Sequence, residues 1–375
     1  MKIAVIGGHL SPALAVIESL LPATQVFFVG RKYTFEGDDA MSLEYKTITD
    51  RGIKFYPLTT GRLQRKFTKN TFMSLTKLPS GFISARKILK EEAPDAVIGF
   101  GGYLSLTVCL AAKSLGIPII IHEQTLEAGL ANKIIGKFAD KVCISWDKSA
   151  EYFPEKNTVL TGNPIRKEIQ VRNEMIATDL KFEGGKETIY ITGGSAGSHA
   201  INDAVYSCLE VLLDEVSVIH QTGDSKEFED FDRLEAKKNS LPVEKKSKYR
   251  LIKFIKPEEV GSVMNNALIV VGRAGINTVS ELIFLKKPAL LIPIPFSQRQ
   301  EQLKNAEMLK EIGLAEILEQ PALNGKTLVD KITYMLENLK KYTINKDFME
   351  HNNAAEKIVE VIRNVAEKEI NKKKK

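Results

Sequence analysis

The sequence predicts an α/β protein built from two doubly wound, Rossmann-like halves, each with a parallel sheet. Short apolar runs alternate with segments of helical spacing along most of the chain, and this order is typical of βαβ units. Glycine turns follow apolar runs in both halves, as they do where a strand leads into a helix. The chain has 375 residues, more than one hydrophobic core usually supports, so two domains are expected.

The first half contains five apolar runs that are predicted to be strands, because each is short and bounded by Gly, Pro or polar residues. Apolar residues at helical spacing predict helices after the first and third runs. The predicted strands are 2–7, 25–30, 95–100, 118–123 and 141–145, and the predicted helices are 12–20 and 104–115.

The second half repeats this order after a polar stretch around residues 165–186. Its predicted strands are 187–192, 216–221, 250–255, 267–272 and 288–294, with helices expected from Ala200 to Leu212 and from Thr278 to Leu285. The predicted division is an N-terminal domain at 1–163, a linker at 164–186, a C-terminal domain at 187–345, and a C-terminal helix with a basic tail at 346–375. Ligands of open α/β sheets bind at the carboxyl ends of the strands, so the site is expected in a cleft between the halves.

The composition excludes several classes of protein. Three cysteines are scattered and lack metal-ligand spacing, so neither a disulfide framework nor a zinc site is expected, and a reducing cytoplasm fits best. No signal-peptide pattern and no apolar run of about 18 residues is present, so the chain is not expected to cross a membrane. No metal-binding cluster is evident, and no metal and no cofactor are expected.

The charge distribution points to an anionic partner. The net charge is +6, and residues 51–90 contain ten basic residues and no acidic one. Large apolar residues lie among the basic ones, a mixture that suits an anionic membrane surface. Nucleic acid would be attracted by the same charge, and a solvated helix face is the plain alternative.

The segment YITGGSAGSHAIND, residues 190–203, joins a predicted strand to a predicted helix through a cluster of glycines. Unpaired N–H groups and the positive end of the helix dipole suit an anion such as a diphosphate there, and a tight turn without a ligand is the alternative. The glycine turns lack both the P-loop ending and a full G-x-G-x-x-G. A nucleoside triphosphatase or a dehydrogenase is therefore poorly supported.

Other polar residues follow strands of both halves. Glu281, on the predicted helix from Thr278, could accept hydrogen bonds from a ribose diol, and Arg273 could face phosphate. Glu301, Gln302 and Asn305 suit a sugar. The alternative for Glu281 is an exposed acid on a helix, and the alternative for Arg273 is a loop arginine without a ligand. Residues 301–305 would equally suit a solvated helix start.

Histidines follow two strands of the first half. His9 comes directly after the first glycine turn, where its imidazole could take a proton from a hydroxyl, and His122 and Glu123 end another predicted strand. A structural histidine is the alternative.

Several segments together resemble the MurG family, the UDP-N-acetylglucosamine:lipid I N-acetylglucosaminyltransferases of peptidoglycan synthesis. The resemblance runs in order from residue 1 to about residue 310 and is most specific at 116–133 and 268–306. It is carried by GGHLSPALAV, GFGGYLSL, GIPIIIHEQTLEAGLANK, TGNPIRKEI, GGSAGSHAIN, GRAGINTVSELIFLKKPALLIPIP and QEQLKNA. It implies a B-type glycosyltransferase fold, in which two domains face a cleft.

The resemblance also implies a donor site in the C-terminal half and an acceptor site in the N-terminal half. His9 would be the catalytic base. The donor residues would be Arg166, Gly194, Ser195, Asn202, Phe254, Ile255, Arg273, Glu281, Glu301 and Gln302. The acceptor residues would be Gly7, Gly8, His122, Glu123, Thr125 and Asn132.

The implied reaction is an inverting displacement. His9 would draw the proton from the 4-hydroxyl of N-acetylmuramic acid in undecaprenyl-linked lipid I as that oxygen attacks the anomeric carbon of the donor, giving lipid II. UDP would leave toward the loop at 193–198, where N–H donors, a helix dipole and arginine would replace a metal cation. Residues 51–90 would touch an anionic membrane at the cytoplasmic face, which makes lipid rather than nucleic acid the expected partner.

The match departs from the family at three places. The first loop, Gly7-Gly8-His9, is about three residues shorter than the Gly-Gly-Thr-Gly-Gly-His of the family, Thr125 stands where Asn is usual, and Ala196 replaces a common Gln. A UDP-sugar enzyme of the same fold with another acceptor or with epimerase activity is one alternative. A module that binds a UDP-sugar or a lipid diphosphate without turnover is the other.

Overall fold

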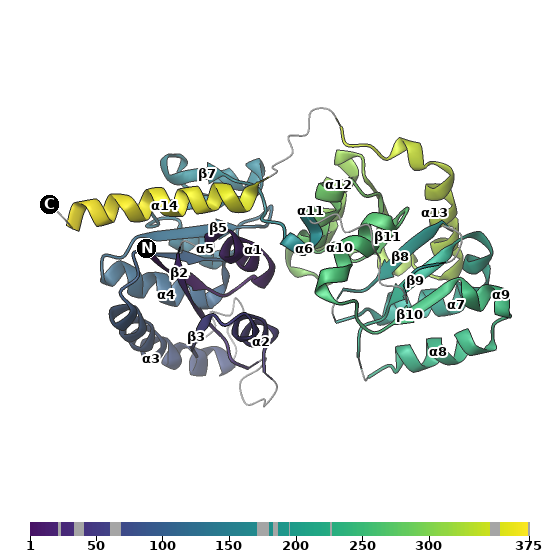
Figure 1. Cartoon of the computed structure of the whole chain (residues 1–375), viewed down its shortest axis with the longest axis horizontal. Coiled ribbons are helices and arrows are strands. Elements are labelled where there is room, and N and C mark those ends of the chain that lie inside the picture. Colours follow the sequence, from purple (N-terminus) through teal and green to yellow (C-terminus); the bar gives the residue numbers. More distant parts are fainter. Residues whose placement is uncertain are drawn as a thin grey trace. The chain divides into compact units, whose positions relative to one another are not determined.

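The computed structural model describes residues 1–21, 24–33, 41–60, 69–170, 180–182, 187–194, 196–225, 227–345 and 353–373, without the side chains of residues 69–77, 298, 372 and 373. The chain divides into two compact units (Figure 1). Unit 1 comprises Met1–Arg166 and His351–Lys375, and unit 2 comprises Lys167–Glu350. Among the described residues, no helix is both long enough and apolar enough to span a bilayer.

Unit 1 is built on a seven-stranded parallel sheet in the order β3-β2-β1-β4-β5-β6-β7. Its strands are β1 Lys2–Ile6, β2 Gln25–Gly30, β3 Lys54–Pro57, β4 Ala96–Gly99, β5 Ile119–Glu123, β6 Lys141–Ile144 and β7 Thr158–Leu160. Its helices are α1 Leu10–Leu20, α2 Leu43–Asp50, α3 Lys69–Glu92, α4 Gly102–Ser114, α5 Leu130–Ile135 and α14 Ala354–Lys373, with 3₁₀ turns η1 Asp147–Tyr152 and η2 Glu155–Asn157.

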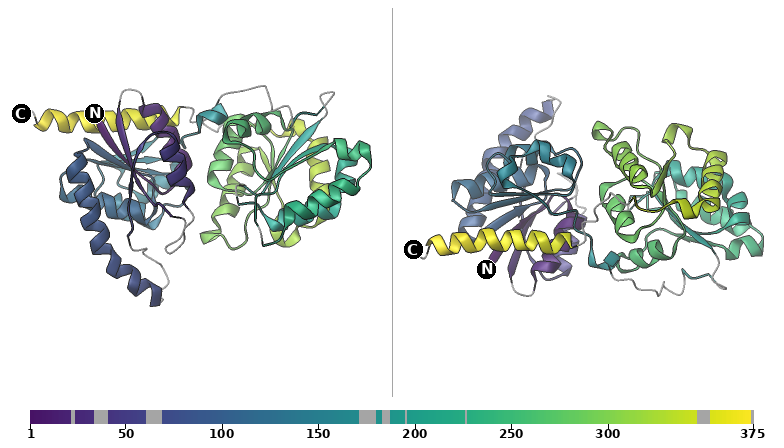
Figure 2. Two further views of the ribbon diagram at one scale, coloured as in Figure 1. Left: turned by 60° about the horizontal axis from the view of Figure 1, so that its bottom comes forward. Right: turned by 90° about the horizontal axis from the view of Figure 1, so that it is seen from above.

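Helices cover both faces of this sheet, as Figure 2 shows. Alternate residues of β1 point to opposite faces, so Ile3 and Val5 belong to one apolar cluster while Ala4 and Ile6 belong to the other. A strand that is buried on both faces reads as a continuous apolar run. This is why the strand is evident from the sequence.

The C-terminal helix α14 packs against α1 of unit 1, although 188 residues or more separate it in sequence from the end of that unit's first segment (Figure 1). Ala355, Ile358 and Ile362 are buried in the same apolar cluster as Ile3 and Val5. The helix therefore closes one face of the first sheet.

Unit 2 is built on a six-stranded parallel sheet in the order β10-β9-β8-β11-β12-β13. Its strands are β8 Thr188–Thr192, β9 Ser217–Gln221, β10 Tyr249–Ile252, β11 Val270–Gly272, β12 Ala289–Leu291 and β13 Ala315–Ile317. Its helices are α6 Lys167–Gln170, α7 His199–Glu215, α8 Asp230–Ser240, α9 Val243–Ser247, α10 Pro257–Asn266, α11 Ile276–Leu285, α12 Glu301–Ile312 and α13 Gly325–Glu337, with 3₁₀ turns η3 Gln298–Gln300, η4 Gln320–Ala322 and η5 Leu339–Lys341.

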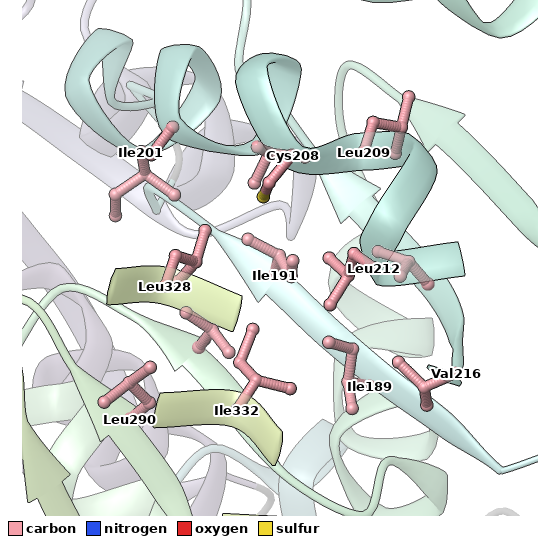
Figure 3. Packing of buried hydrophobic residues seen from close by; sticks show 14 of the residues in the cluster. Ile189, Ile191, Ile201, Cys208, Leu209, Leu212, Val216, Leu290, Leu328 and Ile332 are labelled. Carbon is pink, nitrogen blue, oxygen red and sulfur yellow. The ribbon is translucent and has the colours of Figure 1, made fainter. Parts of the chain in front are cut away.

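The core of unit 2 places α7 and α13 against one face of the sheet (Figure 3). Ile189 and Ile191 of β8 face Leu209 and Leu212 of α7, and Ile332 of α13 lies beside them. Helical spacing of the apolar residues on α7 creates the stripe that this face buries.

The structure confirms two parallel-sheet α/β units, with a strand overlapping every predicted strand range. The sequence analysis missed β3, β7 and β13. All three of these strands lie at a sheet edge, and each has three or four residues, so none offers a long apolar pattern.

Both sheets reverse their strand order at the first strand. In unit 1 the reversal lies between β1 and β4, and in unit 2 it lies between β8 and β11. Helices leave the sheet on opposite faces at such a switch point, which opens a crevice at the carboxyl ends of the two strands. The glycine turns found in the sequence lie at the ends of these strands.

Candidate functional site

The glycine loop at residues 193–198 connects β8 to α7 in unit 2. Gly194 and Gly197 have φ of +83° and +76°, values that residues with a side chain rarely adopt. The Gly194 N–H donates to Thr192 Oγ1 over 3.0 Å, and the Gly197 N–H donates to the Gly194 carbonyl over 3.1 Å. Ser198 caps α7, and Ser195 lies outside the described residues.

This loop packs backbone to backbone against the end of β9. A Cβ added to Gly197 would collide with the carbonyl oxygen of Thr222, and one added to Gly223 would lie 2.5 Å from the Gly197 nitrogen. The two glycines are therefore required by close approach as well as by backbone conformation. The contact fixes the loop against the end of β9.

Arg273 follows β11 and reaches the same loop. Its Nη2 donates to Ser198 Oγ over 2.7 Å and to Gln320 Oε1 over 2.7 Å, and its Nη1 donates to the Ile292 carbonyl over 3.0 Å. Burial lowers the pKa of the guanidinium, which nevertheless keeps its charge because its ordinary pKa is above 12. A fixed cation thus stands beside the first turn of α7, where it can face an anion together with the helix dipole.

Gln221, at the end of β9, joins three segments through one buried amide. Its Oε1 accepts hydrogen bonds from the Ile255 N–H over 3.1 Å and from Tyr190 Oη over 3.2 Å, and its Nε2 donates to the Gly194 carbonyl over 3.2 Å. The predicted donor residue Ile255 therefore has its N–H engaged within the chain. The sequence analysis did not identify Gln221, although its place at a strand end beside the glycine loop was a usable signal.

Asn202 was predicted as a donor residue, and its side chain is only 2% exposed. Its Nδ2 donates to the Thr222 carbonyl and to Asp230, over 3.1 and 2.9 Å. Its Oδ1 accepts from His220 Nε2 over 3.1 Å, and His220 Nδ1 pairs with the Tyr249 hydroxyl over 2.8 Å. Burial lowers the pKa of His220 to about 3, so the ring is neutral. Asn202 therefore supports the glycine loop indirectly, through the Thr222 carbonyl against which Gly197 packs.

The remaining predicted donor residues lie at the same edge of unit 2 or at the unit boundary. Glu281 of α11 is buried rather than an exposed helix acid, whereas Phe254 is 54% exposed. Glu301 and Gln302 begin α12, and Gln302 Oε1 accepts from the Ile294 N–H over 3.1 Å. Arg166 is the last residue of the first segment of unit 1.

Asn305 was singled out in the sequence beside Glu301 and Gln302. Its side chain is fully buried, and its Nδ2 donates to the Ala274 carbonyl over 3.0 Å. It ties α12 to the turn that carries Arg273.

In unit 1, His9 is the N-cap residue of α1 and lies at the end of β1. Its N–H donates to the Phe100 carbonyl over 3.2 Å. A Cβ added to Gly101 would lie 3.4 Å from His9 Cδ2 and 3.6 Å from Asn132 Nδ2, so the histidine and the asparagine border the same glycine. The turn after β4 therefore brings them together.

The environment of His9 favours its neutral form. Solvent reaches the residue, but the chain packed around the ring removes much of its hydration and lowers the pKa of the imidazole, while nearby Glu123 opposes that effect. A neutral imidazole at pH 7 can accept a proton. The position and the protonation state both suit a general base.

Glu123 organises the loop that follows β5. One carboxylate oxygen accepts from the N–H and the hydroxyl of Thr125, over 3.0 and 2.6 Å. The other accepts from the Gly129 N–H over 2.9 Å and from Asn132 Nδ2 over 3.0 Å. Four donors satisfy this buried carboxylate, and the single proton of the Thr125 hydroxyl is shared with the Glu127 carbonyl, 2.8 Å away.

His122 is buried beside His9. Its Nε2 lies 3.3 Å from the Gly162 carbonyl and 3.1 Å from Ser145 Oγ. Because a carbonyl can only accept, Nε2 carries the proton in the neutral ring. Burial lowers the pKa of His122 to about 4. Its Nδ1 and the Asn132 Oδ1 are buried and have no hydrogen-bond partner among the described residues.

Two N–H groups of the first glycine turn are engaged within the chain. Gly7 donates to the Val29 carbonyl over 2.9 Å, and His9 donates to the Phe100 carbonyl. The Glu44 carboxylate lies against Gly7 and close to the Gly8 N–H. The resemblance implied that Gly7 and Gly8 contact the acceptor, and that role remains a prediction. Glu44 was not identified from the sequence.

No group of three or more His, Cys, Asp or Glu side chains among the described residues could hold a metal ion. Among the described residues, the N-terminus of α7 and the guanidinium of Arg273 are positive groups at the glycine loop of residues 193–198.

Comparison with known proteins places the chain in a family. Residues 4–144 and 188–364 match the models of the N-terminal and C-terminal domains of glycosyltransferase family 28. The UDP-N-acetylglucosamine–N-acetylmuramyl-(pentapeptide) pyrophosphoryl-undecaprenol N-acetylglucosamine transferase of Lachnospira eligens is 34% identical over 359 residues, which cover 95% of this chain and 96% of that protein.

Solved structures agree with this result. The crystal structure of MurG from Acinetobacter baumannii matches with a TM-score of 0.70 and 26% identity, over 97% of this chain and 100% of that one. A putative UDP-N-acetylglucosamine 2-epimerase from Listeria monocytogenes matches with a TM-score of 0.68 and 13% identity, over 96% and 95% of the two chains. The second match shows a common fold alone.

The fold and the two glycine-rich switch points define a glycosyltransferase of the two-domain B type. The chain belongs to the MurG family, within glycosyltransferase family 28. The resemblance carried by the sequence motifs is thereby confirmed.

Proposed function

We propose that this protein transfers N-acetylglucosamine from UDP-N-acetylglucosamine to the 4-hydroxyl of N-acetylmuramic acid in lipid I, giving lipid II. The Lachnospira eligens relative, which is 34% identical, is named as an N-acetylglucosamine transferase that acts on N-acetylmuramyl-(pentapeptide) pyrophosphoryl-undecaprenol. The observation that carries the proposal is the donor loop, where two glycines of positive φ, the start of α7 and Arg273 converge. This arrangement suits the diphosphate of a nucleotide sugar.

In the proposed reaction, His9 takes the proton of the acceptor hydroxyl as that oxygen attacks the anomeric carbon, with inversion. Its lowered pKa keeps the imidazole unprotonated at neutral pH. The departing UDP is stabilised at the loop of residues 193–198 by the N-terminus of α7 and by Arg273, and a well-placed donor contributes about 3 kcal/mol. Glu281 would bind the ribose, and Glu301 and Gln302 would contact the donor sugar.

On the acceptor side, the unpartnered buried atoms favour a role for Asn132 and His122. The Asn132 Oδ1 and the His122 Nδ1 are both acceptors that a hydroxyl or an amide of the acceptor could meet. Glu123 and Thr125 would act by shaping the loop that presents Asn132, because their own hydrogen bonds lie within that loop.

We further infer that residues 51–90 face an anionic membrane surface, which would make the protein peripheral at the cytoplasmic face. On the described part of α3, Ile83 is 66% exposed, and Arg86 and Lys87 are exposed near it. Cosedimentation with phosphatidylglycerol vesicles tests this inference. Charge reversal by Arg86→Glu and Lys87→Glu should weaken binding, and equal binding to phosphatidylcholine vesicles would contradict it.

The transfer itself is tested by single-turnover reaction of UDP-N-acetylglucosamine with a short-chain lipid I analogue, with product mass and UDP release recorded together. Disaccharide formed with equimolar UDP supports the proposal. A 2-epimerised sugar nucleotide formed without acceptor would favour an epimerase of the same fold. Donor binding without either product would favour a binding module or another acceptor.

A further inference from the structure

The first glycine turn of unit 1 already holds an anion that belongs to the chain. The Glu44 carboxylate lies where a Cβ of Gly7 would be, and a Cβ added to Gly30 would lie 2.8 Å from Glu44 Oε2. Two glycines from different strands thus leave room for this one side chain. The space that they create is filled by the carboxylate.

A backbone N–H also holds the carboxylate in place. Glu44 Oε2 accepts from the Arg31 N–H over 3.0 Å, and the Gly8 N–H lies close enough to the carboxylate to lower its pKa. The Gly7 and His9 N–H groups donate to the carbonyls of Val29 and Phe100. The carboxylate and two of the three N–H groups of the turn are therefore held by partners within the chain.

Local structure holds Glu44 in this position. It lies in the first turn of α2, where a negative charge interacts favourably with the helix dipole, and Ser42 caps that helix by accepting from the Tyr45 N–H over 3.0 Å. Burial raises the pKa of Glu44, whereas the hydrogen bonds from Arg31 and Gly8 and the charge of Arg31 lower it. A partly buried acid that accepts from a backbone N–H and packs against Gly7 is an internal ligand rather than a solvated helix residue.

The first glycine turn also determines the position of His9. Gly7 lies against Glu44 and Gly8 lies against the 100–101 backbone, since a Cβ at Gly7 would collide with Glu44 Oε1 and a Cβ at Gly8 would lie 2.6 Å from the Phe100 carbonyl oxygen. His9 follows directly and donates to that same carbonyl. A displaced Gly8 would therefore displace the imidazole.

We propose that Glu44 is the resident anion of the first glycine turn: its carboxylate packs against Gly7, fixes the turn through Gly8 and so positions His9. The inference rests on the proposed transferase function for its kinetic test. Glu44 is a positioning residue in this account, since it acts through Gly8 and His9.

The test compares Glu44→Ala, Glu44→Gln and the wild type in transfer to the lipid I analogue, with and without added sodium formate, and with sodium chloride at equal ionic strength as the control. The Ala variant should lose kcat on the order of a hundredfold, the effect of misplacing a catalytic group by about 1 Å, with the donor KM unchanged. Formate should restore a large part of kcat, because it fits the vacated anion position. Formate should not help the Gln variant, whose amide fills that position and presents an NH₂ group to one N–H donor.

Binding of formate gives a second readout that does not depend on transfer. Formate should raise the Tm of Glu44→Ala and leave the Tm of the wild type and of Glu44→Gln unchanged. Unimpaired kcat in the Ala variant would overturn the inference, as would loss of kcat without rescue by formate in a folded variant. A lower acceptor KM in the Ala variant would also overturn it, because it would mean that Glu44 competes with the acceptor for the turn. A wild type that transfers nothing would instead defeat the proposed function, and the Tm experiment would still decide the role of Glu44.

Discussion

Replacement of Gly197 by Ala should damage the donor loop much more than the same replacement at Gly194. Both residues have positive φ, so alanine at either position costs about 1–2 kcal/mol of backbone strain. Their surroundings differ. A Cβ at Gly194 meets no described atom within 4 Å, whereas a Cβ at Gly197 would collide with the Thr222 carbonyl oxygen and lie 3.2 Å from the Gly223 Cα.

The collision can be relieved only by separating the loop from the end of β9, since both contacting groups are backbone. Overpacking of this kind costs about 1–3 kcal/mol in addition to the strain. We therefore expect Gly197→Ala to lower the free energy of unfolding by about 2–5 kcal/mol and Gly194→Ala by about 1–2 kcal/mol. Movement of Thr222 also loosens its hydrogen bond with Asn202, so the KM for UDP-N-acetylglucosamine should rise on the order of tenfold, equivalent to about 1.4 kcal/mol.

The assay must report on unit 2. The single tryptophan of the chain, Trp146, lies in unit 1, so its fluorescence follows the other unit. Hydrogen exchange of β8 and β9 in increasing urea, with UDP binding measured by calorimetry, addresses the loop directly. Equal stabilities of Gly197→Ala and Gly194→Ala within about 0.5 kcal/mol, with equal UDP affinities, would refute the argument from the backbone contact.

Three further predictions concern other parts of the site. His9→Ala should lower kcat a hundredfold or more, the usual contribution of a general base, and should leave UDP affinity unchanged; wild-type turnover in this variant would remove His9 from the mechanism. Gln221→Ala should raise the donor KM severalfold, because Ile255 and Gly194 lose their shared partner, and calorimetry with UDP should show the same loss. His122 and His220 have pKa values of about 4 and about 3 in the folded protein, below the ordinary 6.5, so the unfolded chain binds more protons and stability should fall as the pH drops from 6.5 toward 4. The loss for His122 alone is about 3 kcal/mol, and urea midpoints that do not fall between pH 7.5 and 4.5 would contradict this reasoning.

The strands and helices that form the two sheets could be predicted because their patterns are local. Ile3 to Ile6 are fully buried and all apolar, and a strand that is buried on both faces is recognisable in the sequence as a continuous apolar run. The edge strand β3 was missed because its four residues are half-buried or exposed, so it has no such run. The packing of α14 on unit 1 could not be predicted either, because the spacing of apolar residues in an amphipathic helix does not identify the surface that the helix packs against.

Local sequence patterns likewise predicted some residues of the candidate site and not others. The glycine loop, Arg273 and His9 could be found because each directly follows a strand, and the carboxyl ends of parallel strands meet at one edge of a sheet. Asn202 illustrates the limit of that reasoning. Its sequence position suggested contact with the donor, whereas its side chain is enclosed by Thr222, Asp230 and His220.

The sequence by itself determined the α/β class, the two halves, the family and the turns at which the chemistry is expected, because apolar periodicity and glycine positions are properties of neighbouring residues. Only the tertiary structure decided which polar groups of those turns remain available. Glu44 reaches Gly8 from another element of the sheet unit, and Thr222 approaches Gly197 from the adjacent strand end. A hydrogen bond or a steric contact between distant segments depends on distances that the fold sets, and no local pattern encodes them.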